Sequence, residues 1–237
     1  MGYLAKLRQD VRFIEGLKAC NGCGVCTAIC PAAALHSYDP RQITDIVQQG
    51  KQSDIELLLK SDTIWFCGEC LSCKTRCPRG NTPGYIIQAL RALSIESGLF
   101  IHSIQGQKQL VIKRMVGEHI LKYGYSVFID EIDTDQFPEQ GPVWDWFKAN
   151  KMDVLQRLHT SYNQQQPGTL RQIAPDDLDD LKRIFDETGA TLRFKKIEHY
   201  ASVHAAQLNL NFEEGKDAYF DYLYHNNQPT PSPHETT

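Results

Sequence analysis

The sequence predicts a mostly α-helical protein, and three observations support this fold class. Apolar residues recur at three- and four-residue intervals along much of the 237-residue chain, which places them on one face of a helix. Several of these segments begin at a capping residue or proline and end at glycine, as between Asp39-Pro40 and Gly50. The third observation is that all eight cysteines lie within the first third of the chain, with helical patterns between them.

The cysteines form two copies of one motif. The first copy runs from Cys20 to Cys30, the second from Cys67 to Cys77, and each is followed by proline. Both read C-x2-C-x2-C-x3-C-P, a run that is typical of proteins that bind iron–sulfur clusters through thiolates. Because helices rather than hairpins are expected between the copies, the sequence predicts an α-helical ferredoxin domain with two [4Fe–4S] clusters.

The spacing also predicts which cysteines share a cluster. Three cysteines at three-residue intervals surround one side of a cubane, but the same tight loop does not reach its opposite corner. In two-cluster proteins the fourth cysteine of each run therefore ligates the other cluster. The predicted ligands are Cys20, Cys23, Cys26 and Cys77 for the first cluster, and Cys67, Cys70, Cys73 and Cys30 for the second.

Two other uses of eight cysteines compete with this interpretation. Zinc usually takes its cysteines as two separated C-x2-C pairs, whereas this chain has triple runs that end in Cys-Pro. Disulfides suit small secreted domains, and this chain is neither short nor preceded by an apolar signal segment. Iron therefore remains the favoured interpretation, and no residue is assigned a catalytic role.

The first domain is expected to span residues 1–100. A helix over 3–16 leads into the first motif, with Leu4, Leu7, Val11 and Ile14 as its apolar stripe. Further helices are expected over 31–35, from Asp39-Pro40 to Gly50, and after an N-cap at Ser53. The last helix of this domain begins at Thr82-Pro83 and ends at Gly98.

A mainly helical extension that contacts other subunits is expected over residues 101–225. Helices are predicted over 103–123, from Pro142, from Pro175 to Gly189, over 197–208 and over 213–224, with a short strand or extended arm at 125–129. Residues 226–237 are polar and proline-rich, so a disordered tail is expected. Partner contacts and core packing both explain the aromatic residues of this region, which are Trp144, Trp146, Phe147, Tyr219, Phe220, Tyr222 and Tyr224.

The two motif copies have different neighbours. Trp65 and Phe66 directly precede Cys67, where they either shield a cluster from water or pack in the core. The second copy also carries Lys74 and Arg76, whereas no charge lies between the cysteines of the first copy. Positive charge favours the reduced cluster, so we expect the cluster held by Cys67, Cys70 and Cys73 to have the higher potential. A docking patch or simple solubility explains these cations equally well.

Composition and missing motifs exclude several function classes. The formal net charge is −4, so nothing favours nucleic-acid binding, and no uninterrupted apolar run approaches the 18 residues of a membrane span. G-x-G-x-x-G, P-loop and G-x-S-x-G motifs are absent from the sequence. The charged N-terminus lacks a signal peptide, which predicts a cytoplasmic protein that reaches the membrane, if at all, through its complex.

The paired motifs and the segment N-T-P-G-Y-I-I-Q-A-L-R-A-L at 81–93 resemble the C subunit of heterodisulfide reductase. The resemblance implies an α-helical ferredoxin that carries electrons between a flavin-containing A subunit of the complex and its B subunit, where the disulfide chemistry happens. The segments E-Q-G-P-V-W-D-W and L-K-R-I-F-D-E-T-G look more like the C subunit of sulfur-oxidising heterodisulfide-reductase-like complexes than the short methanogen type. That likeness implies work on sulfane sulfur.

The sequence therefore favours a relay subunit without an active site of its own. The alternatives are the iron–sulfur subunit of a methanogen-type heterodisulfide reductase, a structural or redox-sensing iron–sulfur module, and a freely diffusing ferredoxin. A relay is expected to reduce and reoxidise reversibly with both clusters intact, whereas a sensor would lose a cluster or change partners on oxidation.

Overall fold

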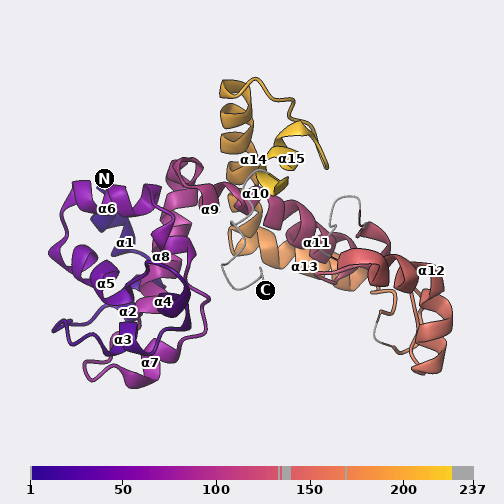
Figure 1. The fold of residues 1–237 in the computed structure, drawn as a ribbon, viewed down its shortest axis with the longest axis horizontal. Coiled ribbons are helices and arrows are strands. Elements are labelled where there is room, and N and C mark those ends of the chain that lie inside the picture. The colour runs from indigo at the N-terminus through magenta and orange to yellow at the C-terminus, as the bar shows by residue number, and fades with distance from the viewer. Residues whose placement is uncertain (1, 133, 135–139, 169, 226–237) are drawn as a thin grey trace, which may run out of the picture. The chain divides into compact units, whose positions relative to one another are not determined.

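The computed structural model describes residues 2–132, 134, 140–168 and 170–225. The chain forms two compact units, the first made of Met1–Gln109 and Lys195–Thr237, the second of Leu110–Phe194. The described residues contain helices and loops but no strand, beyond one isolated bridge between Tyr162 and Leu170. The predicted mostly α-helical fold class is confirmed (Figure 1).

The N-terminal part of the first unit is a set of short helices around one longer helix. The central helix is α8 (Pro83–Ser97), which packs against most of the other elements of this part. The elements around it are α1 (Tyr3–Leu7), α2 (Val11–Gly16), α3 (Val25–Ala28), α4 (Pro31–Leu35), α5 (Pro40–Gln49), α6 (Gln52–Lys60), η1 (Thr63–Trp65), α7 (Ser72–Arg76), η2 (Leu99–His102) and α9 (Ile104–Gln107).

The core of this part lies where α8 meets α2, α5 and α6. Ile86, Ile87 and Leu90 of α8 are fully buried there and drive the packing through the apolar area that they remove from water. Gly16 lets α2 approach closely, because a Cβ at this position would lie 3.1 Å from the backbone nitrogen of Ile86. The Gly16 carbonyl accepts a hydrogen bond from the Thr82 N–H at 2.8 Å, which fixes α2 at the start of α8.

Several predicted helix ends are confirmed. Asp39 caps α5 by accepting from the N–H groups of Arg41 and Gln42, and Gly50 ends that helix in the left-handed region. Gly98 ends α8 in the same way, and the predicted helix over Pro31–Leu35 is α4. Thr82 occupies the N-cap position of α8, but its side chain makes no capping hydrogen bond to the described residues of this helix.

The single helix predicted over 3–16 is wrong. The Asp10 side chain accepts from the Arg12 N–H and starts a new helix, so α1 and α2 are separate. The break changes the buried face: Leu7 and Phe13 are buried, whereas Val11 is 68% exposed. The predicted N-cap at Ser53 is also wrong, because α6 begins at Gln52 and Lys51 occupies the N-cap position.

The second unit contains most of α10 (Gln109–Ile112), then η3 (Lys113–Gly117), α11 (Glu118–Tyr123), η4 (Ile129–Glu131), α12 (Gly141–Arg157) and α13 (Pro175–Glu187). The helix predicted over 103–123 is thus interrupted, with a π turn at η3. Its predicted end at Gly124 is confirmed by a left-handed φ of 77°. Gly117 leaves room for the ring of Phe194, which a Cβ would meet at 2.5 Å.

The strand or arm predicted at 125–129 is loop followed by η4. Phe128 stacks on Tyr123 with centroids 4.0 Å apart, and it packs with Ile129, Leu155 and Tyr162 in a small core of this unit. The β-type composition of this segment therefore serves packing in a loop, because the described part of the chain offers it no strand to pair with.

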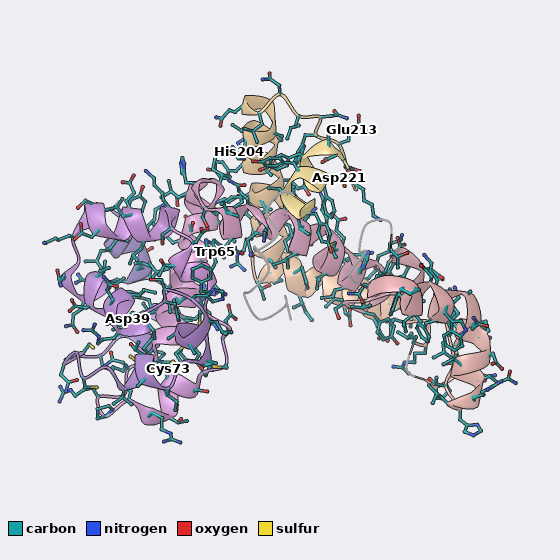
Figure 2. All side chains as sticks on the ribbon, viewed as in Figure 1. Asp39, Trp65, Cys73, His204, Glu213 and Asp221 are labelled. Carbon is teal, nitrogen blue, oxygen red and sulfur yellow. The ribbon has the colours of Figure 1, made fainter. Side chains whose placement is uncertain are left out.

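The C-terminal part of the chain contains α14 (Ala190–Gln207) and α15 (Ala218–His225). α14 is longer than the predicted 197–208 segment, and α15 begins five residues after the predicted 213. Tyr219 and Phe220 are buried, and the Tyr219 hydroxyl lies 2.8 Å from His204 Nδ1. Figure 2 labels His204 on α14. The tail predicted to be disordered at 226–237 lies outside the described residues. Across the described residues, every helix is too short or too polar to cross a membrane.

Candidate iron–sulfur site

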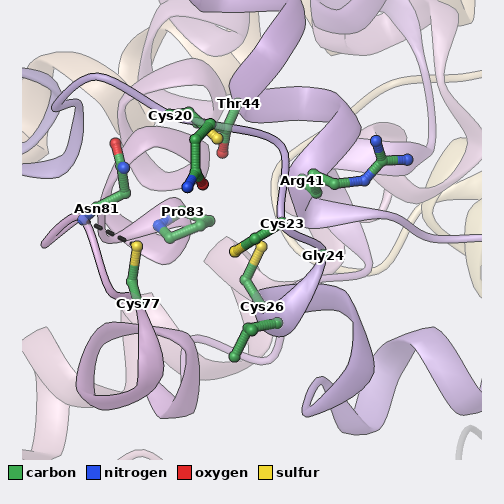
Figure 3. A pocket seen from close by; sticks show the side chains of 11 residues that line it. Cys20, Cys23, Gly24, Cys26, Arg41, Thr44, Cys77, Asn81 and Pro83 are labelled. Carbon is green, nitrogen blue, oxygen red and sulfur yellow. Dashed lines mark hydrogen bonds between the residues drawn. The ribbon is translucent and has the colours of Figure 1, made fainter.

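The first predicted ligand set lines one pocket of the first unit. Cys20, Cys23 and Cys26 come from the first motif copy, and Cys77 reaches the same pocket from the second copy (Figure 3). The empty space among the lining side chains is about 320 Å³, including its opening to solvent. Pro83, Thr44 and Arg41 complete much of the wall. The structure therefore brings together the four cysteines that the spacing argument grouped.

The second predicted set is gathered by shared neighbours. Cys73 interacts electrostatically with both Cys67 and Cys70, while the Tyr38 hydroxyl hydrogen-bonds with Cys67 and also interacts with Cys30. Tyr38 is only 5% exposed. Cys30 of the first copy and Cys67 of the second thus share Tyr38 as a neighbour. The short helices α3 and α7, which carry Cys26 and Cys73, pack against each other.

Both motif copies have the same backbone conformation. The second and fourth residues after the first cysteine have positive φ in each copy: Gly22 and Gly24 at 70° and 80°, and Glu69 and Leu71 at 55° and 58°. The N–H of the second residue points at the thiol of the first cysteine, with Gly22 N and Glu69 N each 3.4 Å from Sγ. The fourth residue is the N-cap of α3 or α7. This turn orients the first three cysteine side chains of each copy toward the same space.

The first copy is held by amide side chains. Gln48 of α5 accepts from the Cys20 N–H at 2.7 Å and donates to the Cys20 carbonyl at 3.2 Å. Asn81 accepts from the Lys18 N–H at 2.7 Å, and its own backbone N–H lies 3.2 Å from Cys77 Sγ. One asparagine therefore ties the approach to the first motif to the last cysteine of the second.

The second copy is held by one arginine of α8. The Arg91 guanidinium donates to the carbonyls of Ile64 and Cys67 at 2.7 and 2.6 Å and pairs with Glu69 at 2.6 Å. It also lies over the Trp65 ring, 5.5 Å from the centroid. Since 17% of the Arg91 side chain is exposed, this charge is mostly removed from water and satisfied by three oxygen acceptors.

The pKa values of three cysteine thiols are shifted in different directions. Burial raises the pKa of Cys26 and of Cys73, and nearby cysteines raise both further. A hydrogen bond with Ser72 lowers the pKa of the exposed Cys70. Since iron binds thiolates, loading these two half-buried positions must displace their protons.

The donor set fits a four-iron cluster. All eight cysteines are free of disulfides, and four of them surround one pocket. In a [4Fe–4S] cluster each thiolate binds a different iron, so the sulfurs lie around the cluster rather than at one point. Within the described residues, His, Cys, Asp and Glu side chains form no group of three that could hold a single metal ion.

Trp65 and Phe66, which were predicted either to shield a cluster or to pack in the core, both contact the core. Trp65 packs against the hydrophobic core, and its buried Nε1 has no hydrogen-bond partner among the described residues. Phe66 also contacts this core and stacks on His36 with centroids 4.3 Å apart. Lys74 and Arg76 are exposed, and Lys74 lies over the Tyr85 ring. A cation also lies near the first copy, although none occurs within its motif: Arg41 of α5 lines its pocket.

Four residues that contact the cysteines or hold their loops were missed from the sequence: Tyr38, Gln48, Asn81 and Arg91. Arg91 and Asn81 stand outside the motif spacing, and Tyr38 lies in the loop between α4 and α5. Asn81 follows Cys77-Pro78 at a fixed offset where the first copy has Ala34, so a comparison of the copies beyond Cys-Pro would have singled it out.

The aromatic residues of the extension serve mainly as core. Tyr219 and Phe220 are buried, and Trp144 and Phe147 pack against the small core of the second unit. Trp146, in contrast, is 59% exposed on α12, which also carries the exposed Val143.

Comparison with known proteins gives a consistent relationship. Residues 16–81 match the 4Fe-4S dicluster domain family. The chain is 40% identical over 121 residues to the C subunit of the ferredoxin:CoB-CoM heterodisulfide reductase of Methanosarcina acetivorans, which covers 50% of this chain and 45% of that protein. It is 30% identical over 121 residues to the second iron–sulfur C subunit (C 2) of the CoB–CoM heterodisulfide reductase of Methanocaldococcus jannaschii, covering 51% and 57%.

A longer match is to the C2 subunit of the H(2)/formate:CoB-CoM heterodisulfide,ferredoxin reductase of Methanococcus maripaludis, at 31% identity over 151 residues. It covers 61% of this chain and 74% of that protein. For the first two relatives, the matched region spans about half of their length.

Proposed function

The chain belongs to the family of heterodisulfide reductase C subunits, and from that premise we propose that it is an electron-transfer subunit with two [4Fe–4S] clusters. When bound, the clusters would supply one-electron transfer. The single observation that carries the proposal is the pocket shared by Cys20, Cys23, Cys26 and Cys77. Because one motif copy supplies three cysteines of this pocket and the other copy supplies the fourth, the pocket supports two adjacent clusters that each take one ligand from the other copy.

The residues around the cysteines would bind, orient and shield the clusters. Cys20, Cys23, Cys26 and Cys77 would hold the first cluster, and Cys67, Cys70, Cys73 and Cys30 the second. Gln48 and Arg91 fix the backbone of the first cysteine of each copy, so that the sulfurs keep their positions when iron charge changes. The chain's own role ends at placement and tuning, and the chemistry on substrate belongs to a partner.

We further propose two partners, a flavin-containing A subunit of the complex and a catalytic B subunit with paired cysteines, met in the cytoplasm. Residues 101–225 would contribute contacts to them beyond the cluster domain of residues 1–100. The exposed Trp146 and Val143 on α12 support this role, because aromatic side chains are enriched where interfaces form.

For the substrate of the whole complex, we propose sulfane sulfur, and methanogen-type reduction of the CoB–CoM heterodisulfide is the second candidate. The first rests on the likeness of segments 139–146 and 181–189 to their counterparts in sulfur-oxidising complexes. The second is favoured by the names of the relatives, which are reductases of that heterodisulfide. Assaying the purified complex with each substrate separates the two, since only one should change the redox state of the clusters within turnover time.

The experiment that tests the relay is anaerobic isolation of the tagged chain with its native partners. We expect about eight iron atoms per chain, two reversible one-electron steps, and co-purification of a flavoprotein and a protein rich in paired cysteines. A chain that holds fewer than four irons, or that loses a cluster at each reoxidation, would instead be a structural or sensing module. A chain that elutes alone with both clusters intact would be a diffusing ferredoxin.

A further inference from the structure

Asn81 has a hydrogen-bond donor that nothing in the described structure uses. Its side chain is buried, with 2% exposure, and its Nδ2 is one of two buried side-chain nitrogen or oxygen atoms without a partner among the described residues. A buried amide donor without an acceptor destabilises the folded state, so an asparagine at this position needs an explanation. The residue lines the pocket formed by Cys20, Cys23, Cys26 and Cys77 (Figure 3).

The orientation of this amide is fixed by its neighbours. Oδ1 accepts from the Lys18 N–H at 2.7 Å, and a backbone N–H requires an oxygen there rather than an NH2 group. The hydrogen-bond network therefore assigns Nδ2 to the other position of the amide. The backbone N–H of the same residue already lies 3.2 Å from Cys77 Sγ, so Asn81 stands directly beside a predicted ligand.

We propose that Asn81 Nδ2 donates a hydrogen bond to a sulfur of the cluster that Cys20, Cys23, Cys26 and Cys77 would hold, and that it thereby raises the reduction potential of that cluster alone. The inference rests on the proposed function, since it presupposes a cluster in this pocket. Hydrogen bonds to cluster sulfurs stabilise the more negative, reduced form.

The second site differs at the corresponding position. The residue that corresponds to Asn81 after Cys30-Pro31 is Ala34, and the polar group beside Cys67 and Cys30 is the Tyr38 hydroxyl instead. The two clusters would thus be tuned by different groups, which allows one potential to be moved without the other. Asn81 is a tuning residue in this scheme and does not ligate iron.

The test is a redox titration of the cluster-loaded full chain, followed by EPR. Asn81→Leu, which removes the donor, should lower one of the two potentials and leave the other at its wild-type value. Tyr38→Phe should shift the other potential. Thr44→Val is the matched control, because Thr44 is a buried residue of the same pocket whose hydroxyl already donates to the Pro40 carbonyl at 2.8 Å. It should move neither potential.

A second readout is the nitrogen itself. In reduced protein labelled with [15Nδ2]-asparagine, pulsed EPR should show a 15N coupling that Asn81→Leu abolishes. Should Asn81→Leu fail to take up iron, the 15N coupling of the wild-type protein decides the matter, because it reports on Nδ2 without any substitution.

The inference is overturned if Asn81→Leu carries two clusters with unchanged potentials, or if wild-type protein shows no coupling to Nδ2. These results leave the relay itself intact. If wild-type protein holds no [4Fe–4S] cluster at all, the proposed function fails first, and the iron content shows which of the two has happened.

Discussion

The two motif copies reach one backbone conformation by different means. In the first copy, glycine occupies both left-handed positions and neutral amides of Gln48 and Asn81 hold the loop. In the second copy, Glu69 and Leu71 occupy the same positions, and Arg91 binds both the Glu69 carboxylate and the Cys67 carbonyl. At Glu69 a side-chain anchor therefore replaces the conformational freedom that glycine provides in the first copy.

The largest effect on the two sites is expected from removing the cysteine that each motif copy contributes to the cluster of the other. Cys77→Ala should abolish the cluster of the first copy, and Cys30→Ala that of the second, because each cluster would lose one of four ligands. Iron analysis and EPR of each variant check this, with the remaining cluster as internal control. If Cys77→Ala removes the cluster that Cys67→Ala also removes, the exchange of ligands is wrong.

Next in size is the loss of the arginine that holds the second copy. Arg91→Met keeps the length of the side chain but leaves the Ile64 and Cys67 carbonyls and Glu69 without their donor. We expect a loss of about 3 kcal/mol in the free energy of unfolding, since hydrogen bonds to a charged group contribute about 1.5–3 kcal/mol each and water replaces part of them. Anaerobic urea unfolding of the loaded chain measures it.

The control for Arg91 is Lys60→Met in the same unit. Lys60 pairs with Glu56 one helical turn away, and both side chains are more than a third exposed, so a loss of roughly 0.5 kcal/mol is expected. Equal losses for the two variants would show that Arg91 acts only through surface charge.

A smaller effect is expected from the glycine that starts α3. Gly24→Ala adds a Cβ that meets no protein atom within 4 Å beyond its chain neighbours, but Gly24 also lines the pocket of the first copy. The expected loss is therefore at least that of the left-handed backbone, about 1–2 kcal/mol. The reciprocal change, Leu71→Gly, relaxes the same backbone position but removes contact with Gly84, so a smaller net change is expected. Urea midpoints of the two variants compare them, and an equal or larger loss for Leu71→Gly would contradict this account.

The smallest effect is expected from the exposed cations of the second copy. Lys74→Gln with Arg76→Gln should lower the potential of the second cluster, because positive charge favours the reduced state. Water screens both groups, so the shift should shrink further as ionic strength rises from about 0.01 to 1 M and the Debye length falls from about 30 to 3 Å. An unchanged potential at low salt would remove these cations from the tuning of the clusters.

The sequence predicted those features in which the chemistry of a site or a helix cap fixes the spacing between residues. The interval between cysteines predicted which thiols share the pocket of the first copy, and Asp39, Gly50 and Gly98 predicted helix ends because capping is local. It failed where two local signals compete. Leu4, Leu7, Val11 and Ile14 share one helical stripe, yet the capping carboxylate of Asp10 divides the helix and exposes Val11.

Long-range anchors could not be predicted for a different reason. Arg91 lies on the polar side of a regular helical pattern, and nothing in its neighbours indicates that three oxygens converge there from residues 64–69. The strand expected at 125–129 shows a related limit, since aromatic and β-branched residues suit both a sheet and a packed loop.

The position of Cys77 in the pocket of the first copy has a consequence for synthesis of the chain. Cys77 is the last cysteine to leave the ribosome, and its thiol stands beside the three that were made first. A nascent chain that ends anywhere before α7 offers only incomplete cages. Iron delivery would therefore wait for nearly the whole cysteine-bearing segment to emerge, and both clusters would be inserted late and together.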